Sequence, residues 1–211
     1  MTSNERNFGV FFKRFHTVPR LFSIEECDRI IEYFEKNTSI KASVVNVSES
    51  KPNQVVSKFD KNVRDGSLVF CDHKVAEMNF AFQKLNYAVI WANFGWSVFP
   101  LRFLQIAKYD ANNDGGYYKS HRDIILENRP QRIFSSVTQL SQPENYTGCE
   151  LVFEKPEDPP RLEEYKNKGD TIFFTSIENH EVKPVLSGIR YSLTAWFEGP
   201  PIWNIESEYY V

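Results

Sequence analysis

The chain has 211 residues, of which 41% are hydrophobic, 15% aromatic and 25% charged, and its formal net charge at pH 7 is −3. This length is enough for one domain with a sizeable core, and the composition is that of a soluble globular protein rather than a disordered one. The slight acidic excess argues against a nucleic-acid partner, because such proteins usually carry surplus basic residues.

The start of the chain and its cysteines predict a cytoplasmic protein. Residues 1–7 are polar and lack the apolar stretch of a signal peptide. Cys27, Cys71 and Cys149 are widely spaced and form no C-x-x-C pair, so we expect buried free thiols in a reducing compartment. The most apolar window, residues 88–107, is interrupted by polar residues and a proline, which indicates core rather than a membrane span.

The N-terminal half predicts helices that support a sheet. Residues 8–22 are typical of an edge strand or an arm. Ser-Ile-Glu-Glu at residues 23–26 is a capping box, and the apolar spacing that follows predicts a helix ending near Asn37. Residues 75–91 predict a second helix. The polar segment 42–65 predicts a long loop with room for one short strand, which is either a lid over a binding site or a mobile excursion.

After Trp96 the chain changes to short apolar or alternating segments separated by turns. Two helices followed by evenly spaced strands indicate an α+β fold, mainly β, with a β-sandwich or jelly roll. We expect one domain over residues 1–211, with a helical and loop region (1–98), a jelly-roll catalytic core (99–199) and a C-terminal tail (200–211). The predicted strands are 99–109, 117–122, 132–140, 150–154, 171–175, 181–184 and 190–197.

A histidine and an aspartate stand two positions apart in the stretch 117–123. In an extended strand, residues i and i+2 point the same way, so His121 and Asp123 face one place. An imidazole and a carboxylate make up two thirds of the two-histidine, one-carboxylate ligand set of non-haem Fe(II) oxygenases. Taken alone, the pattern also fits a surface histidine beside a solvated aspartate.

The second histidine of such a set must come from another segment. His16 and His73 are most simply solvent-facing. His180 begins a later strand, and residues far apart in sequence meet across the two sheets of a jelly roll, so His180 can reach Asp123.

An arginine follows His180 by ten residues. Strand alternation places Arg190, Ser192 and Trp196 on one face. An inward-facing arginine is costly unless it meets an anion, and its planar fork suits a carboxylate. Ser192 could add a hydroxyl donor. The alternative is a buried structural Arg–Asp pair.

These residues, in this order and spacing, resemble the Fe(II)- and 2-oxoglutarate-dependent dioxygenases, in particular the prolyl-4-hydroxylase-like group that includes PKHD-type hydroxylases. The similarity covers roughly residues 105–199, and residues 23–34 resemble the capped helix that opens such domains. The matching pieces are Tyr109 and residues 118–123, 148–151, 168–170, 174–176, 180–185 and 188–193.

The resemblance implies a double-stranded β-helix, a cupin-like jelly roll, in which His121, Asp123 and His180 bind Fe(II). It implies 2-oxoglutarate and O2 as cosubstrates, with ascorbate as a supporting reductant. The implied reaction hydroxylates a prolyl or other residue of a peptide or protein and releases succinate and CO2.

The resemblance also assigns the remaining pocket. Arg190 is expected to pair with the distal carboxylate of 2-oxoglutarate, helped by Tyr109 and Ser192. Tyr118 and Trp196 are candidate walls of the substrate pocket, and core packing is the alternative for both.

Other interpretations stay open at this point. The same chemistry could act on a free amino acid or another small metabolite. The chain could instead be a non-catalytic jelly-roll binding module, or a metal-dependent cupin of another type such as an isomerase.

Overall fold

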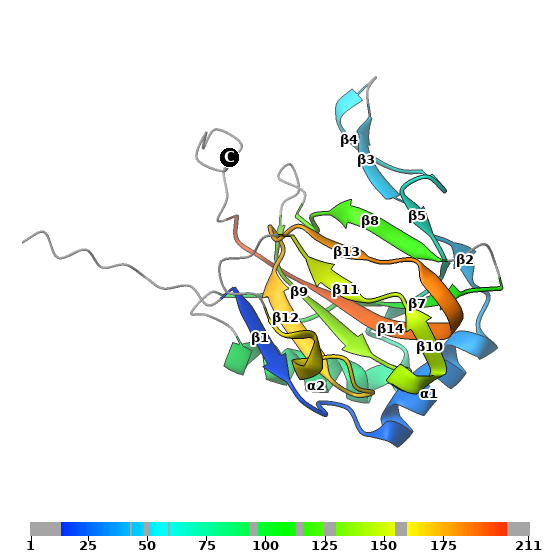
Figure 1. Cartoon of the computed structure of the whole chain (residues 1–211). Helices are drawn as coiled ribbons and strands as arrows, with labels where there is room; N and C mark the ends of the chain where they lie inside the picture. Colours follow the sequence, from blue (N-terminus) through cyan, green and yellow to red (C-terminus); the bar gives the residue numbers. More distant parts are fainter. Residues whose placement is uncertain are drawn as a thin grey trace, which may run out of the picture.

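The computed structural model describes residues 14–42, 44–48, 51–58, 60–92, 97–112, 116–124, 130–154 and 160–201. Within these ranges two α-helices lie on one face of a large antiparallel sheet, and a smaller sheet lies over its other face (Figure 1). The helices are α1 (Ile24–Lys36) and α2 (Asn79–Ala92), accompanied by the short 3-10 turns η1 (Ala76–Met78), η2 (Pro143–Asn145) and η3 (Leu162–Glu164).

The large sheet has eight strands in the described part of the chain. They are β1 (Phe15–Val18), β2 (Ile40–Lys41), β6 (Ser67–Asp72), β7 (Phe103–Asp110), β9 (Gln131–Gln139), β10 (Tyr146–Gly148), β12 (Thr171–Thr175) and β14 (Val185–Gly199). Their order is β1-β12-β9-β14-β7-β6-β2, and β10 pairs with the first part of β14.

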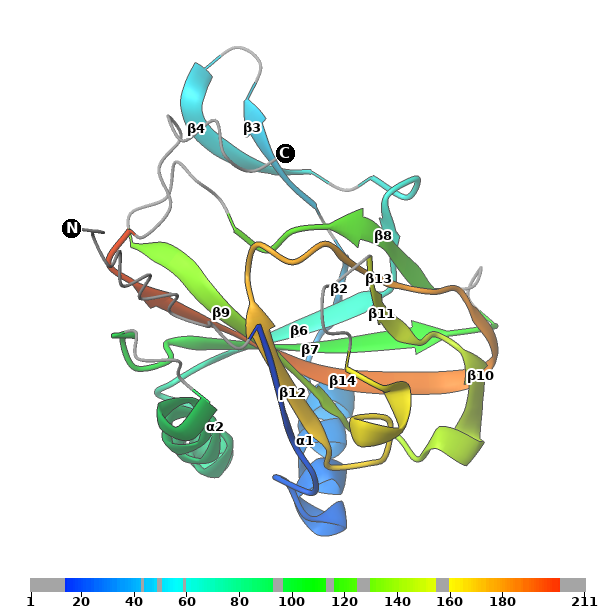
Figure 2. The same ribbon diagram turned by 60° about the vertical axis from the view of Figure 1, so that its left-hand side comes forward.

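The small sheet has the order β11-β13-β8-β5. Its strands are β11 (Leu151–Phe153), β13 (His180–Val182), β8 (Tyr117–His121) and β5 (Arg64–Asp65). The second view shows the two sheets facing each other, with both helices beneath the large one (Figure 2). This arrangement is a double-stranded β-helix, which confirms the predicted jelly roll.

Residues along β14 alternate between two faces, as the sequence predicted, and each face borders a different core. Leu193, Ala195 and Phe197 join the core between the large sheet and the helices. The residues between them face the space enclosed by the two sheets. Ile172 and Phe174 of β12 belong to the core between the sheets, so the large sheet is buried on both faces.

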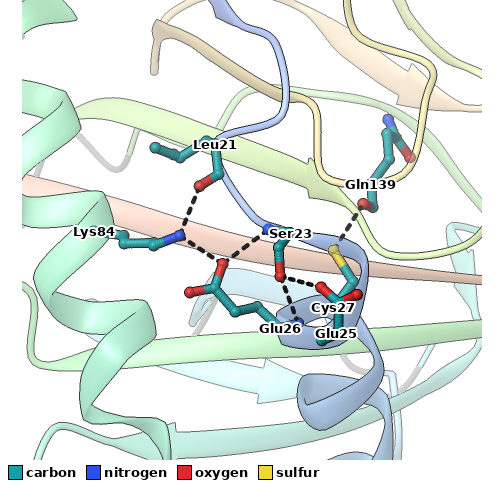
Figure 3. Close-up of polar contacts among 7 residues, drawn as sticks. All are labelled: Leu21, Ser23, Glu25, Glu26, Cys27, Lys84 and Gln139. Atoms are coloured by element: carbon teal, nitrogen blue, oxygen red, sulfur yellow. Dashed lines mark hydrogen bonds and ion pairs between the residues drawn. The ribbon is translucent and has the colours of Figure 1, made fainter.

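The capping box predicted at residues 23–26 is present and links the two helices (Figure 3). The Ser23 hydroxyl accepts from the backbone N–H of Glu26 at 3.2 Å, and the Ser23 N–H donates to the Glu26 carboxylate at 2.8 Å. Lys84 of α2 donates to the same carboxylate and to the Leu21 carbonyl oxygen. The cap therefore fixes both the start of α1 and its position against α2.

Changing Ser23 to alanine should lower the free energy of unfolding by about 1 kcal/mol, because the orphan N–H groups of the first helical turn lose their acceptor. Ser23→Asp keeps an acceptor at the cap and should stay close to the wild-type value. Urea unfolding followed by circular dichroism measures both. Equal midpoints for Ser23→Ala and wild type would contradict this role for the cap.

The prediction of a loop over residues 42–65 was wrong. Strands β3 (Val44–Ser48) and β4 (Lys51–Lys58) form an antiparallel hairpin that projects from the body of the molecule, and β5 follows it (Figures 1 and 2). Pairing shifts from Ser48↔Lys51 to Val47↔Val55. The shift leaves residues 52–54, which include Pro52, outside the regular pairing, where proline is tolerated in a strand.

Several smaller features bear on the other expectations. Cys27, Cys71 and Cys149 are buried and free, as predicted. Strand β14 begins at Val185, earlier than predicted, where it pairs with the unpredicted strand β10. Among the described residues, no helix has the length and hydropathy needed to cross a membrane.

Candidate active site

Two histidines lie opposite each other on neighbouring strands of the small sheet. His121 ends β8, His180 begins β13, and the two are paired in register. Asp123 follows two residues after His121, and its N–H donates to the Ser176 carbonyl oxygen. One ligand atom from each of the three side chains lies within 4.8 Å of the others. We expected the histidines to meet across the two sheets, but they meet within one sheet, because β8 and β13 are adjacent.

Backbone carbonyls orient both imidazoles. The Nδ1 atom of His121 is 2.8 Å from the Lys119 carbonyl oxygen, and that of His180 is 2.9 Å from the Glu178 carbonyl oxygen. Each Nδ1 therefore carries the proton and donates it, which leaves the Nε2 lone pair free. The Nε2 atoms lie 3.8 and 3.6 Å from the two carboxylate oxygens of Asp123. The three donors converge without a proton between them, as a metal site requires.

The surroundings of the cluster favour a neutral imidazole at His121 and an ionised carboxylate at Asp123. Burial, and then the neighbouring His180, lower the pKa of His121 to about 4. Burial alone would raise the pKa of Asp123, but His180, His121 and the Arg132 guanidinium outweigh it and hold that pKa below its ordinary value. Tyr118 stacks on His121 with ring centroids 3.5 Å apart, and burial raises the pKa of Tyr118 to about 12.

An arginine from the large sheet reaches the same space. Arg190 lies on β14 and is only 1% exposed. Its Nε and Nη2 atoms donate to the Gln139 side-chain oxygen at 3.0 and 2.8 Å. Its Nη1 atom is buried and has no hydrogen-bond partner among the described residues. A buried, charged donor without an acceptor is costly, so this end of the guanidinium suits an anion.

The residues predicted to bind the metal, the cosubstrate or the substrate all line one cavity of about 410 Å3. Tyr109 is buried, and its ring centroid lies 5.7 Å from the Arg190 guanidinium carbon. Ser192 is also buried and lines the cavity, and Tyr118 and Trp196 form part of the cavity wall. His16 and His73 are not among the lining residues; His73 is exposed, whereas His16 is half-buried on β1 rather than solvent-facing.

The donor set fits a divalent transition metal. Two neutral imidazoles and one carboxylate are the facial ligand set of non-haem Fe(II), and three protein ligands leave other metal positions open. Arg190 lies in the same cavity and could hold a carboxylate. The cavity can therefore bring together a metal ion and an organic acid away from bulk water.

Three further residues in or beside the cavity were not predicted from the sequence. Gln139 holds Arg190, Arg132 stacks over Trp196 at 4.3 Å, and Arg64 lines the cavity from β5. Strand alternation gave a usable signal for Gln139, because it shares a face with buried Val137 and a polar residue there needs a partner. Arg64 gave no such signal because its segment was expected to be a loop.

Comparison with known proteins places this chain among oxygenases in sequence similarity. The sequence model of the 2OG-Fe(II) oxygenase superfamily matches residues 104–198, just under half of the chain. A PKHD-type hydroxylase of Crocosphaera subtropica is 36% identical over 83 residues, which are 38% of this chain and 36% of the relative. One from Shewanella baltica is 25% identical over 187 residues, which are 86% of this chain and 76% of the relative. The matched segment thus spans about a third of the first relative and three quarters of the second.

Solved structures share the fold. A viral collagen prolyl hydroxylase from Paramecium Bursaria Chlorella virus-1, solved with 2-oxoglutarate, superimposes with a TM-score of 0.61 at 20% identity, covering 89% of this chain and 97% of the other. A prolyl hydroxylase of Trichoplax adhaerens, in complex with a hypoxia inducible factor peptide, gives a TM-score of 0.65 at 14% identity, with coverages of 87% and 83%. A prolyl-4-hydroxylase of Pseudomonas putida gives 0.59 at 16%, with coverages of 87% and 91%.

Proposed function

We propose that the chain is a 2-oxoglutarate-dependent hydroxylase of the 2OG-Fe(II) oxygenase superfamily, whose sequence model matches residues 104–198, and that it holds Fe(II) with His121, Asp123 and His180. The observation that carries the proposal is the convergence of these three donors in one cavity with the unpaired Nη1 of Arg190. A non-catalytic binding module would have no use for both features together.

Each residue has a defined task in this proposal. The carbonyls of Lys119 and Glu178 fix the histidine tautomers, so both Nε2 atoms face the metal. Asp123 supplies the negative ligand. When bound, Fe(II) with 2-oxoglutarate and O2 supplies the oxidising chemistry, which yields succinate, CO2 and a hydroxylated substrate. Burial of the site keeps water away from the reacting groups.

The cosubstrate is held from the large sheet. Arg190 offers its free Nη1 to the distal carboxylate of 2-oxoglutarate, and a charge-assisted bond of this kind is the strong type. Tyr109 and Ser192 line the same part of the cavity and can add hydroxyl donors. Gln139 is a positioning residue, because it fixes the other two guanidinium donors.

Changing Gln139 to glutamate should raise the KM for 2-oxoglutarate by at least about tenfold, because a carboxylate on Arg190 would satisfy the charge that the cosubstrate needs. The thermal midpoint should hold, since the new pair replaces an existing contact. Steady-state succinate release at varied 2-oxoglutarate, together with thermal unfolding, measures both. A wild-type KM in a folded variant would contradict the assigned position of Arg190.

The substrate we propose is a prolyl or other residue of a peptide. The solved structures that share the fold support this choice, since they include prolyl hydroxylases and one of these was solved with a peptide. Tyr118 and Trp196 are the proposed walls for that residue. A free amino acid or small metabolite is the competing substrate class. The buried free thiols fit a reducing compartment, so we place the protein in the cytoplasm.

The direct test is turnover. Purified protein with Fe(II), 2-oxoglutarate and ascorbate should release succinate, and a peptide library in the same mixture should contain members that gain one oxygen atom by mass. Added oxygen in a metabolite library but in no peptide would change the substrate class. No succinate under any of these conditions would overturn the proposed function.

A further inference from the structure

The cavity carries more positive charge than its proposed occupants would neutralise. Among the described lining residues there are four arginines and one aspartate. A dipositive iron and a dianionic 2-oxoglutarate cancel each other, so a surplus of three positive charges (4 − 1) remains. The arginines are Arg64, Arg122, Arg132 and Arg190.

Three of the four have their own partners. Arg190 is assigned to 2-oxoglutarate. Arg132 lies over the Trp196 ring at 4.3 Å and is also near enough to the Asp123 carboxylate to lower the pKa of that group. Arg122 is exposed, so water screens its charge, and its Nε donates to the Asn179 side chain at 3.1 Å. These three leave the charge of Arg64 to be explained.

Arg64 is buried without an anion. It is 5% exposed, and its Nε has no hydrogen-bond partner in the described structure. Its Nη1 lies 3.5 Å from the Gln105 side-chain oxygen, which is a weak contact at best. Its guanidinium carbon stands 4.3 Å from the Tyr118 ring centroid. No described carboxylate forms an ion pair with it.

The contact with Tyr118 does not balance this burial. A cation over an aromatic ring is a modest stabilisation, whereas an unpaired buried charge carries a large desolvation cost. The unpaired charge of Arg64 lies at the wall of the cavity, where a ligand can reach it. A guanidinium held in place with an unused donor is ready to receive an anion.

The position of Arg64 separates it from the cosubstrate. It lies on β5 of the small sheet and pairs in register with Tyr118, which itself stacks on His121. Arg190 lies on β14 of the large sheet. The two arginines therefore reach the cavity from opposite sheets, and Arg64 belongs to the side that carries the candidate metal ligands.

We infer that Arg64 binds an acidic residue of the substrate, so that the peptide hydroxylated here has an aspartate or glutamate close to the modified residue. This inference rests on the proposed function and specifies its substrate. The planar guanidinium fork matches the two oxygens of a carboxylate, which is why we assign a carboxylate to it. The surplus positive charge of the cavity favours the same class of substrate.

Peptide binding without turnover tests the inference. Full-length protein loaded with Fe(II) and 2-oxoglutarate under strict exclusion of O2 is titrated calorimetrically with short prolyl peptides. In each set, one position within three residues of the proline is aspartate, asparagine or phosphoserine. The variants are Arg64→Gln, Arg64→Lys and, as a matched arginine of the same cavity, Arg122→Gln. Thermal unfolding checks that each variant is folded.

In at least one register the aspartyl peptide should bind wild type about tenfold or more tightly than its asparaginyl twin. Arg64→Gln should bring that ratio close to one, Arg64→Lys should keep part of it, and Arg122→Gln should keep most of it. A ratio near one in wild type, no binding of any peptide, or a ratio that survives in Arg64→Gln would overturn the inference. Tightest binding of the phosphoseryl peptide would overturn the carboxylate assignment.

The outcome is separable from that of the proposed function. Succinate release by the same preparation, measured without peptide, reports the oxygenase chemistry on its own. Succinate release without acidic selectivity would remove only the inference about Arg64. Selective binding of acidic peptides without any succinate release would support the Arg64 site and contradict the proposed hydroxylase activity.

Discussion

Asp123→Ala is expected to lower 2-oxoglutarate turnover by more than about 100-fold. Losing a group that only hydrogen-bonds to a metal ligand costs up to about 100-fold, and Asp123 is proposed to be a ligand itself. The change leaves two neutral imidazoles, which hold a divalent ion far more weakly than the full set. The protein should still fold, because the backbone of this residue is held by the Ser176 carbonyl oxygen. Succinate release and bound iron measured on one preparation give both quantities.

The chain offers a matched control for this experiment. Asp72 also lies beside a histidine, with its carboxylate 3.2 Å from Nδ1 of His73, but both side chains are more exposed than those of the cluster and lie outside the cavity. Asp72→Ala should therefore release succinate at the wild-type rate. Equal turnover in Asp123→Ala and Asp72→Ala would remove the proposed iron site.

The second large effect is expected at Arg190. Arg190→Gln should weaken 2-oxoglutarate binding by about 100-fold, which corresponds to the roughly 3 kcal/mol typical of truncating one partner of a buried charge pair. The loss should appear mainly in the KM for 2-oxoglutarate, because the metal ligands stay in place. Kinetics at varied cosubstrate concentration, with iron saturating, would show this.

Arg190→Lys separates charge from shape. Lysine keeps the positive charge but loses the planar fork and the double contact with Gln139, so its KM should lie between those of wild type and Arg190→Gln. If the glutamine and lysine variants both bind 2-oxoglutarate within about twofold of wild type, the anion is held elsewhere.

The helices and most strands of the core could be predicted from sequence because their signals are local. The capping box at residues 23–26 defined the start of α1, and alternation defined which face of β14 each residue occupies. His121 and Asp123 also meet at one place, as the sequence predicted, although β8 ends at His121 and Asp123 lies just beyond it. His180 could be predicted as the second histidine ligand because the chain has only four histidines and a jelly roll brings distant segments together.

The remaining features depend on pairings that no local pattern encodes. The hairpin β3–β4 is polar and contains a proline, so its composition indicates a loop, and only pairing between its own strands makes it a ribbon. Arg64 becomes a cavity residue because β5 pairs with β8. The direct neighbourhood of His121 and His180 likewise follows from strand order in the small sheet, which sequence spacing leaves open.

The central claim is that one metal ion and one 2-oxoglutarate share this cavity, so their binding must be coupled. Calorimetric titration of 2-oxoglutarate under anaerobic conditions, with and without Fe(II), measures that coupling directly. We expect one equivalent to bind in the presence of iron, with an affinity at least about tenfold higher than in its absence. Equal affinity with and without iron, or no binding in either case, would contradict the account.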